Sequence, residues 1–463
     1  ILQLILKDGV DIDSLLVVTF TNAAAGEMRE RIGSALLKAI DGSNGGSEHL
    51  RRQLNLLSKA SISTIHSFCI SVIRKYFNVI NLDPGFRIGD ETECSLIKLE
   101  VLEDLFESEY EKGSEAFLGL VERFSDNRQD AALQELVLNL HAFVQSKPFP
   151  RQWLEERIED FARDAGSMED SPWCQALLLS IQMEIQGIID MLTEAVDLCR
   201  KPYGPAAYED NLADDINQMN EVLLAGERGG LKACMASYAG VGFSRLKSCG
   251  KDVDHDLKKR VRDLRDKAKK AWSSLGGGLL SRGLDLGIEQ LNELYPYIRC
   301  LGELVFEFDR QYKKQKQDRG IIDFNDLEHY ALDILQHEEA ARELRDKYSY
   351  IFIDEYQDSN LVQETILSCI CREDNLFMVG DVKQSIYRFR LADSSIFLGK
   401  YGEYHPEEGQ INRRIDLNRN FRSRAHIING VNYLFRNIMS SRFGELDYDD
   451  KAALYPGLSL PPI

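Results

Sequence analysis

The most informative stretch of the chain is Tyr350–Asp358, with the sequence YIFIDEYQD. Four apolar or aromatic residues typical of a buried strand run directly into two adjacent acids, Asp354 and Glu355. In open parallel α/β sheets, ligands bind at the carboxyl ends of the strands. The stretch therefore predicts a parallel strand whose end presents two carboxylates to a ligand.

Two consecutive acids at a strand end can divide the chemistry of phosphoryl transfer between them. Asp354 is a candidate Mg²⁺ ligand, because Mg²⁺ prefers hard oxygen donors. Glu355 is a candidate for polarising a water aimed at a γ-phosphate. The alternative is a strand that runs into an exposed acidic turn, and the strand before the acids with Tyr-Gln-Asp after them favours a built site.

A second strand and turn are predicted at Val379–Arg390, with the sequence VGDVKQSIYRFR. Gln384 has a neutral amide that can hydrogen-bond both a γ-phosphate and a water. Tyr387, Phe389 and Arg390 place aromatic rings beside guanidinium groups, a combination that stacks bases and binds phosphates of single-stranded nucleic acid. The alternative is that the rings belong to the core and the arginines to the surface.

A third candidate segment is Asp416–Ser423, with the sequence DLNRNFRS, between a predicted strand and a predicted helix. Arg422 could supply positive charge to a γ-phosphate in the transition state, as an arginine finger does. The alternative is an ordinary helix start, in which Ser423 serves as the N-cap.

Two weaker signals lie in the first half of the chain, at Val18–Ala25 (VTFTNAAA) and Ser63–Cys69 (STIHSFC). Each closes a predicted strand with small polar residues, and the first also carries Phe20. A single histidine such as His66 is more often a satisfied core residue than a functional one.

The hydrophobic pattern predicts an α/β domain interrupted by helices. Strands and helices alternate over 14–87 and again from 350 onward, whereas 91–318 has helical spacing almost throughout, with Gly-rich loops at 226–230 and 276–278 and a surface loop at 41–47. Lys258–Lys270 is either a solvated helix face or a helix that contacts phosphates. We expect strands at 14–20, 61–66, 350–353, 376–379 and 413–417, and helices at 23–40, 68–77, 361–371, from 383 onward and at 425–438.

Composition limits the classes of protein that fit. The 463 residues suggest about three domains, and the net charge of −19 excludes a generally basic nucleic-acid coat, so any nucleic-acid contact must be local. No uninterrupted apolar run approaches the roughly 20 residues of a membrane span, so we expect no membrane association. Nine cysteines without metal-ligand spacing indicate reduced thiols in a cytoplasmic protein.

Together, the five segments resemble, in order and spacing, motifs of the UvrD/Rep-like helicase superfamily. The stretch Gly320–Leu327 (GIIDFNDL) and the Val-Lys of Val379–Arg390 narrow the resemblance to the A subunits of bacterial AddAB helicase–nucleases, which are relatives of the RecB subunit of RecBCD.

The resemblance implies a RecA-like parallel-sheet domain, 1A, interrupted by a large all-helical insertion, 1B, and followed by the start of a second RecA-like domain, 2A. The expected boundaries are 1–88 and 320–410 for domain 1A, 89–319 for the insertion and 411–463 for the start of domain 2A.

The resemblance also implies ATP and Mg²⁺ as cofactors. Asp354 becomes the metal ligand, Glu355 the water activator, and Gln384 and Arg422 the γ-phosphate contacts. The residues implied to contact DNA are Phe20, Thr21, Asn22, His66, Tyr387, Phe389 and Arg390.

The implied function is ATP-dependent translocation on single-stranded DNA by a helicase and exonuclease subunit that processes double-strand breaks for recombinational repair. The implied partners are DNA ends and a second, AddB-like subunit in a heterodimer, in the bacterial cytoplasm at the nucleoid. Two alternatives stay open: a UvrD-like repair helicase without a nuclease domain, and a non-catalytic DNA-binding subunit.

The chain departs from the family pattern in one respect. No G-x-x-x-x-G-K-[ST] phosphate loop occurs in the sequence, and Gly250-Lys251 does not qualify because Asp252 follows it. We expect this loop to precede Ile1, and the late helicase motif and the nuclease domain to follow Ile463. We therefore expect the isolated chain to hydrolyse ATP negligibly.

Overall fold

The computed structural model describes the chain except for residues 43–47, 125–129, 163–170, 251, 278–283 and 458–463. The chain forms two compact units, which are described separately. The first comprises Ile1–Cys94, Gln145–Pro148 and Lys316–Ile463, and the second comprises Ser95–Val144 and Phe149–Gln315. The sequence-based boundaries of domains 1A, 1B and 2A stay predictions.

A four-stranded parallel sheet is the centre of the first unit. Its strands are β1 (Leu15–Thr19), β2 (Ser61–Thr64), β5 (Tyr350–Ile353) and β6 (Leu376–Met378), in the order β2-β1-β5-β6. Val17 of β1 lies opposite both Ile62 and Phe352, so strands from distant parts of the sequence are in register. The predicted fold class, a parallel α/β sheet with a helical insertion, is confirmed.

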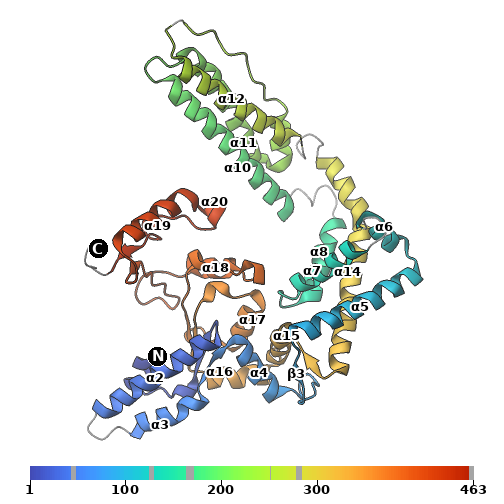
Figure 1. Ribbon diagram of the computed structural model, residues 1–463, viewed down its shortest axis with the longest axis vertical. Coiled ribbons are helices and arrows are strands. Elements are labelled where there is room, and N and C mark those ends of the chain that lie inside the picture. The colour runs from blue at the N-terminus through green and yellow to red at the C-terminus, as the bar shows by residue number, and fades with distance from the viewer. Residues whose placement is uncertain (43–47, 125–129, 163–170, 251, 278–283, 458–463) are drawn as a thin grey trace. The chain divides into compact units, whose positions relative to one another are not determined.

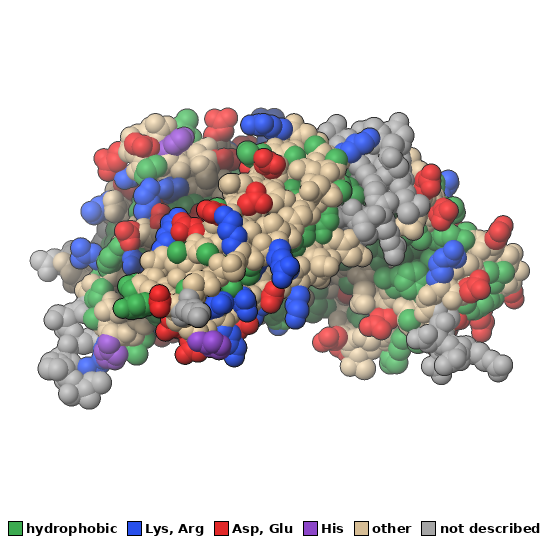
Figure 2. Space-filling model, turned by 90° about the horizontal axis from the view of Figure 1, so that it is seen from above, with side chains coloured by type: hydrophobic (Ala, Val, Ile, Leu, Met, Phe, Trp, Pro, Cys, Tyr) green, Lys and Arg blue, Asp and Glu red, His purple; other side chains and the backbone are tan. Residues whose placement is uncertain are grey.

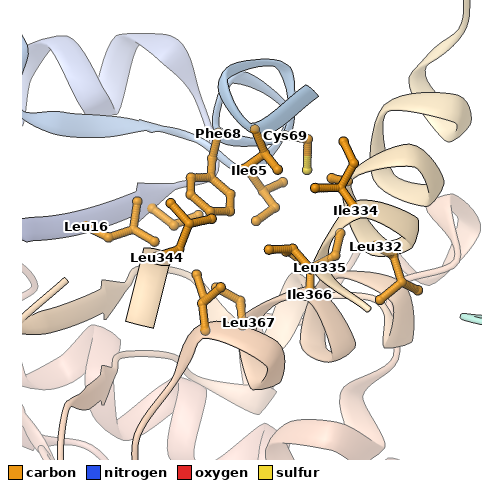
Figure 3. Close-up of a cluster of buried hydrophobic side chains, with 14 of the residues drawn as sticks. Leu16, Ile65, Phe68, Cys69, Leu332, Ile334, Leu335, Leu344, Ile366 and Leu367 are labelled. Carbon is orange, nitrogen blue, oxygen red and sulfur yellow. The ribbon is translucent and has the colours of Figure 1, made fainter. Parts of the chain in front are cut away.

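Alternation along the strands sends side chains to two faces of the sheet. Leu16 and Ile351 enter one core beneath α4 (Ile65–Tyr76), α15 (Phe324–Leu335), α16 (Glu338–Lys347) and α17 (Leu361–Ile370). Figure 3 shows this core, where Leu16, Phe68, Leu344 and Ile366 converge. Leu15 and Val17 enter a second core with α2 (Asn22–Gly42) and α3 (Glu48–Leu56).

Shorter elements complete the first unit (Figure 1). They include α1 (Leu2–Leu6), the parallel pair β3 (Arg87–Ile88) and β4 (Ile321–Ile322), and the single-turn helices η1 (Ile12–Ser14), η2 (Leu57–Lys59), η5 (Tyr356–Asp358), η6 (Val382–Gln384) and η7 (Arg388–Arg390). Toward the C-terminus lie α18 (Ser394–Glu403), β7 (Arg419–Asn420), α19 (Ala425–Ile438), α20 (Ser441–Gly444) and β8 (Tyr455–Pro456).

Three sequence-based expectations for the first unit were wrong. The helix expected from Lys383 is two separate 3₁₀ turns, η6 and η7, because Asp381 caps the first turn through its side chain and the chain then extends at Ser385. The strand expected at 413–417 is reduced to one bridge between His405 and Arg413, and the strand lies instead at Arg419–Asn420. The surface loop expected at 41–47 begins inside α2, which runs to Gly42, and residues 43–47 lie outside the described residues.

The regular elements among the described residues of the second unit are all helices, as the sequence predicts, and residues 241–250 connect two of them without regular structure. Most of α5 (Glu91–Lys112) and of α14 (Leu284–Asp318) lies in it. The other helices are α6 (Glu115–Phe124), α7 (Ala131–Val144), α8 (Pro150–Glu159), η3 (Asp160–Ala162), α10 (Pro172–Cys199), η4 (Ala206–Tyr208), α11 (Glu209–Tyr238) and α12 (His255–Gly276). On the face shown in Figure 2, acidic and basic side chains are interspersed rather than segregated.

Among the residues that the structure describes, one helix is long and apolar enough to cross a membrane by length and composition alone. Helix α10 has 28 residues and a window of mean hydropathy 1.3. In the structure, Ile185 and Leu192 of α10 are fully buried in a core shared with α11 and α12, and the central helix of a bundle meets the same criteria. The sequence expectation considered only uninterrupted apolar runs and therefore missed this helix.

The Gly-rich loop expected at 226–230 is a kink within α11. Gly229 and Gly230 have non-helical backbone angles, with φ +69° and ψ −163° at Gly230, and helix continues on both sides. This combination of angles is accessible essentially to glycine alone. Leu231 and Cys234, beyond the kink, return to the buried core of the unit.

The basic run Lys258–Lys270 lies on α12 and includes an internal ion pair. The Arg265 guanidinium donates two hydrogen bonds to Asp215 of α11, at 2.6 and 3.0 Å, and both side chains are buried. Arg265 also donates to the carbonyl of Ser244 at 2.9 Å. At least this member of the basic run stabilises the bundle, and a phosphate-contacting role for the other members stays a prediction.

Asp215→Ala is expected to weaken the packing of α11 against α12. Because the substitution leaves the Arg265 charge buried and unpaired, the free energy of unfolding of this unit should fall by about 3–5 kcal/mol. Amide hydrogen exchange in α11 and α12 measures this loss. The control is Glu194→Ala, which removes the exposed partner of Arg260 and should cost less than about 1 kcal/mol. Equal effects of the two substitutions would contradict the prediction.

Candidate functional site

The two acids of the central strand lie where the sequence places them, directly after β5. The backbone N–H of Asp354 donates to the carbonyl of Val18 at 3.0 Å, which continues the hydrogen-bonded ladder with β1. Glu355 follows with a left-handed backbone, φ +53° and ψ +43°, and its N–H donates to Asp354 Oδ1 at 3.1 Å. This reversal leaves the Glu355 carboxylate exposed and the Asp354 carboxylate partly exposed at the strand end.

A buried amide, Gln357, joins the acids to the second candidate segment. Its Nε2 donates to Glu355 Oε2 at 2.8 Å, and its Oε1 accepts from the backbone N–H of Asp381 at 2.9 Å. Gln384 Nε2 in turn donates to Asp381 Oδ2 at 3.0 Å. Glu355, Gln357, Asp381 and Gln384 therefore form one continuous chain of hydrogen bonds across the ends of β5 and β6.

Close packing against this amide explains the glycine after β6. A Cβ at Gly380 would lie 2.6 Å from Gln357 Oε1 and 2.9 Å from the Phe397 ring. The position therefore excludes a side chain, since an added methyl group would displace the amide that links the two segments.

Burial and neighbouring charged groups shift the pKa values of the carboxyl groups at the strand ends in different directions. Burial, with the negative charge of Glu355, raises the pKa of Asp354 above its ordinary value, and the same two causes raise the pKa of Asp358. Burial also acts to raise the pKa of Asp381, but hydrogen bonds from Lys383 and Gln384 outweigh it and lower the pKa overall. Lys383 Nζ lies 2.7 Å from Asp381 Oδ1.

Arg422 lies after β7, with an exposed side chain. Its backbone N–H donates to Asn420 Oδ1 at 2.9 Å, and that of Ser423 does so at 2.8 Å. Among the described residues, no interaction joins Arg422 to the hydrogen-bond chain of Gln357. The alternative, with Ser423 as the N-cap, was wrong, because Arg424 holds that position and Asn420 binds the preceding N–H groups instead. The role of Arg422 stays a prediction.

Four of the residues predicted to contact nucleic acid lie together, and we call them the aromatic cluster. The Phe20 and Tyr387 ring centroids are 4.8 Å apart, and those of Tyr387 and Phe389 are 5.8 Å apart. The Arg390 guanidinium lies 5.3 Å from the Tyr387 centroid and 5.7 Å from that of Phe389. Because Phe389 is 75% exposed, the aromatic cluster presents a ring face to solvent rather than to the core.

Thr21 and Asn22 adjoin the aromatic cluster in sequence and begin α2. The Thr21 hydroxyl accepts a hydrogen bond from the N–H of Ala24 at 3.1 Å, so this side chain helps to start the helix. Asn22 is exposed at the first position of the helix. Contact of either residue with nucleic acid stays a prediction.

His66 is on α4 and contacts two residues of α15 that the sequence analysis missed. Its Nε2 lies 3.2 Å from Glu328 Oε1, and its ring meets the Phe324 ring edge-on with centroids 5.4 Å apart. Phe324 lies within the stretch GIIDFNDL, and Glu328 directly follows it. The contacts of these two residues with His66 cannot be predicted from the local sequence pattern.

Metal binding at this site would rest on few protein ligands. The described residues contain no group of three or more His, Cys, Asp or Glu side chains that could hold a metal ion. Asp354 nevertheless fits Mg²⁺, which commonly takes one or two carboxylates and fills its remaining positions with water and substrate phosphates.

An apolar hollow of about 760 Å³ is lined by Asp354 together with residues of β1, β5 and β6 and of the helices α1 and α2. Its lining is mainly apolar and includes Val17, Met28, Phe352 and Phe377. This composition does not suit a triphosphate, so we assign the polar chemistry to the strand ends and not to the hollow.

Polar side chains gathered at the carboxyl ends of parallel strands are typical of α/β domains that bind nucleotides. Residues 1–211 and 281–405 match the model of the UvrD/REP helicase N-terminal domain. Since this match covers more than half of the chain, the chain belongs to that family.

Within this family, the chain is similar to A subunits of ATP-dependent helicase/nucleases, as the sequence resemblance predicts. The chain is 52% identical over its whole length to the A subunit of the ATP-dependent helicase/nuclease from Alkaliphilus oremlandii, and 51% identical over 99% of its length to that from Syntrophomonas wolfei. The protein of the same name from Alkaliphilus metalliredigens is 48% identical over the whole chain. The chain spans 37–38% of the length of these relatives.

Asp354→Asn is expected to stabilise the protein at neutral pH. Because the folded-state pKa of Asp354 is raised, the ionised carboxylate costs stability, and that cost develops as the pH rises above about 4. The melting temperature at pH 7 should rise by about 1–3 °C, and the gain should shrink as the pH is lowered toward about 4. Asp374→Asn, at an exposed acid, is the control. A lower melting temperature for Asp354→Asn would contradict this cause.

Proposed function

We propose that this chain is part of an ATP-driven DNA helicase subunit of a helicase–nuclease. The observation that carries the proposal is the hydrogen-bond chain from Glu355 through Gln357 and Asp381 to Gln384 at the ends of adjacent parallel strands. Such a chain links a candidate water activator to a candidate γ-phosphate sensor, so both would respond to one bound nucleotide.

Each residue of the strand ends has a distinct part in this proposal. Asp354 would hold Mg²⁺, which supplies positive charge to the phosphates when bound. Glu355 would orient the attacking water and take its proton, and Gln357 holds one of its carboxylate oxygens in place. Gln384 would sense the γ-phosphate through its amide, and Arg422 would add charge from beyond β7.

The aromatic cluster is proposed to bind single-stranded DNA. Aromatic faces stack on bases of any sequence, and arginine binds the backbone phosphates. The exposure of Phe389 and the proximity of Phe20, Tyr387 and Arg390 support this assignment. Thr21, Asn22 and His66 are proposed as further contacts along the strand.

The names of the relatives support the finer parts of the proposal. These names describe the A subunits of ATP-dependent helicase/nucleases, which favours a helicase–nuclease over a helicase without a nuclease. We propose an AddB-like second subunit, double-strand DNA ends as substrate, a role in recombinational repair, and a cytoplasmic location at the nucleoid.

Glu355→Gln, introduced into the full-length protein, tests the catalytic proposal. The substitution keeps the shape of the side chain and the metal ligand Asp354 but removes the group that accepts the proton of water. ATP binding should change less than about twofold, while DNA-stimulated ATP hydrolysis should fall by a factor of about 10²–10⁴.

The matched control is Glu373→Gln, at an exposed glutamate beyond α17, which should hydrolyse ATP at the rate of the unsubstituted protein. Normal turnover by Glu355→Gln would remove Glu355 from the reaction.

Phe389→Ala tests the proposed DNA surface. Loss of one stacking ring should weaken binding of single-stranded oligonucleotides by about 1–3 kcal/mol, measured by fluorescence anisotropy at fixed salt. Tyr433→Ala is the control, because Tyr433 is similarly exposed but lies on α19, outside the aromatic cluster. Equal affinities of the two variants would argue that Phe389 serves another role.

A further inference from the structure

A carboxylate outside the strand-end site is buried where three helices meet. Glu328 of α15 is 5% exposed, and α15 packs against both α4 and α17. Taking a carboxylate out of water costs free energy unless hydrogen bonds compensate the loss. The residues around Glu328 must therefore supply such hydrogen bonds.

Three side chains bind this carboxylate. Asn360 Nδ2 donates to Glu328 Oε2 at 3.0 Å, Gln363 Nε2 donates to Oε1 at 2.7 Å, and His66 Nε2 lies 3.2 Å from Oε1. Burial acts to raise the pKa of Glu328, but the hydrogen bonds, that of His66 first, outweigh it and lower the pKa overall. Glu328 therefore stays ionised at neutral pH.

An ionised carboxylate only accepts hydrogen bonds, so the contact fixes the state of His66. The ring must carry a proton on Nε2, and Nδ1 is then the nitrogen left for other partners. The imidazole is 37% exposed, so it is only partly enclosed by the protein.

Helix α15 holds this imidazole from two directions. Phe324 and Glu328 are four residues apart and therefore share one face of the helix. Phe324 meets the ring edge-on at a centroid distance of 5.4 Å, while Glu328 binds Nε2. The ring of His66 is thus oriented by a packing contact and a hydrogen bond together.

The other two partners of Glu328 connect it to the turn after the acids. Asn360 is the N-cap of α17 and accepts from the N–H of Gln363 at 2.8 Å. Only η5 and Ser359 separate Asn360 from Glu355. One carboxylate therefore contacts both a predicted DNA contact and the start of the helix that follows the predicted water activator.

We propose that Glu328 is a positioning residue that fixes the tautomer and orientation of His66 and couples the DNA-contacting surface to the turn that carries Glu355. This inference rests on the proposed function.

The geometry favours positioning over a purely structural role. Asn360 and Gln363 already give each oxygen of Glu328 one hydrogen bond, so two amides hold the carboxylate in place and His66 adds a third contact, from a ring that is partly exposed. Replacing a buried ionic cluster as a whole by apolar side chains of similar volume is often neutral for stability, so stability alone does not account for a carboxylate at this position.

A double-substitution cycle in the full-length protein tests the proposal. ATP hydrolysis is measured against the concentration of a single-stranded oligothymidylate for the unsubstituted protein, Glu328→Gln, His66→Ala and the double variant. Glu328→Gln should raise the DNA concentration for half-maximal stimulation about tenfold while the KM for ATP changes less than twofold. In the His66→Ala background, the same substitution should add less than a twofold effect, because the residue it positions is absent.

Glu339→Gln, at an exposed glutamate of α16, is the matched control and should behave as the unsubstituted protein. A thermal melt of each variant identifies any loss of folding. Unchanged DNA response in a folded Glu328→Gln, or a tenfold effect that persists in the His66→Ala background, would overturn the proposal.

A second measurement separates this proposal from the proposed function. Failure of the unsubstituted protein to respond to DNA would refute the proposed function and the coupling, but not the contact between Glu328 and His66. Reaction of His66 with diethyl pyrocarbonate, followed by mass spectrometry with the exposed His255 as reference, tests that contact. Glu328→Gln should raise the relative rate at His66 at least twofold, and an unchanged rate would show that Glu328 does not hold the ring.

Discussion

Strand β5 is hydrogen-bonded on both sides, to β1 and to β6, and the geometry of the site depends on this central position. Beyond Ile353, the N–H of Asp354 still donates to the carbonyl of Val18, and the chain then reverses at Glu355 through a left-handed backbone. That reversal brings Gln357 back under the strand end, within hydrogen-bonding distance of the segment after β6. A non-glycine residue in this conformation costs free energy, which the surrounding hydrogen bonds offset.

Much of the fold could be predicted because its strands are short apolar runs bounded by polar turns. Tyr350–Ile353 and Leu376–Met378 are such runs, and both strands lie within a residue of their predicted bounds. Prediction failed where local pattern and three-dimensional context compete. The residues after Lys383 have helical spacing, yet the side-chain cap at Asp381 and the packing of the aromatic cluster hold them in separate 3₁₀ turns.

The candidate site was predictable in part for the same reason. Asp354, Glu355 and Gln384 follow directly from strands, so sequence alone places them at one edge of a parallel sheet. Gln357 and Glu328 could not be assigned roles in this way, because the partners that define those roles, Asp381 for Gln357 and His66 for Glu328, lie far away along the chain. The spacing of a motif shows where a group lies, whereas its hydrogen-bond partners depend on how helices pack.

The kink in α11 makes the path of this helix depend on the backbone of Gly230, a residue without a side chain. The backbone angles at Gly230 set the direction in which the second half of α11 leaves the first. That second half ends at Tyr238, whose ring stacks on Trp272 of α12 with centroids 4.5 Å apart. Position 230 is therefore closed to the other amino acids by backbone conformation alone, and variation among homologous bundles is expected in the surrounding surface while this joint stays glycine.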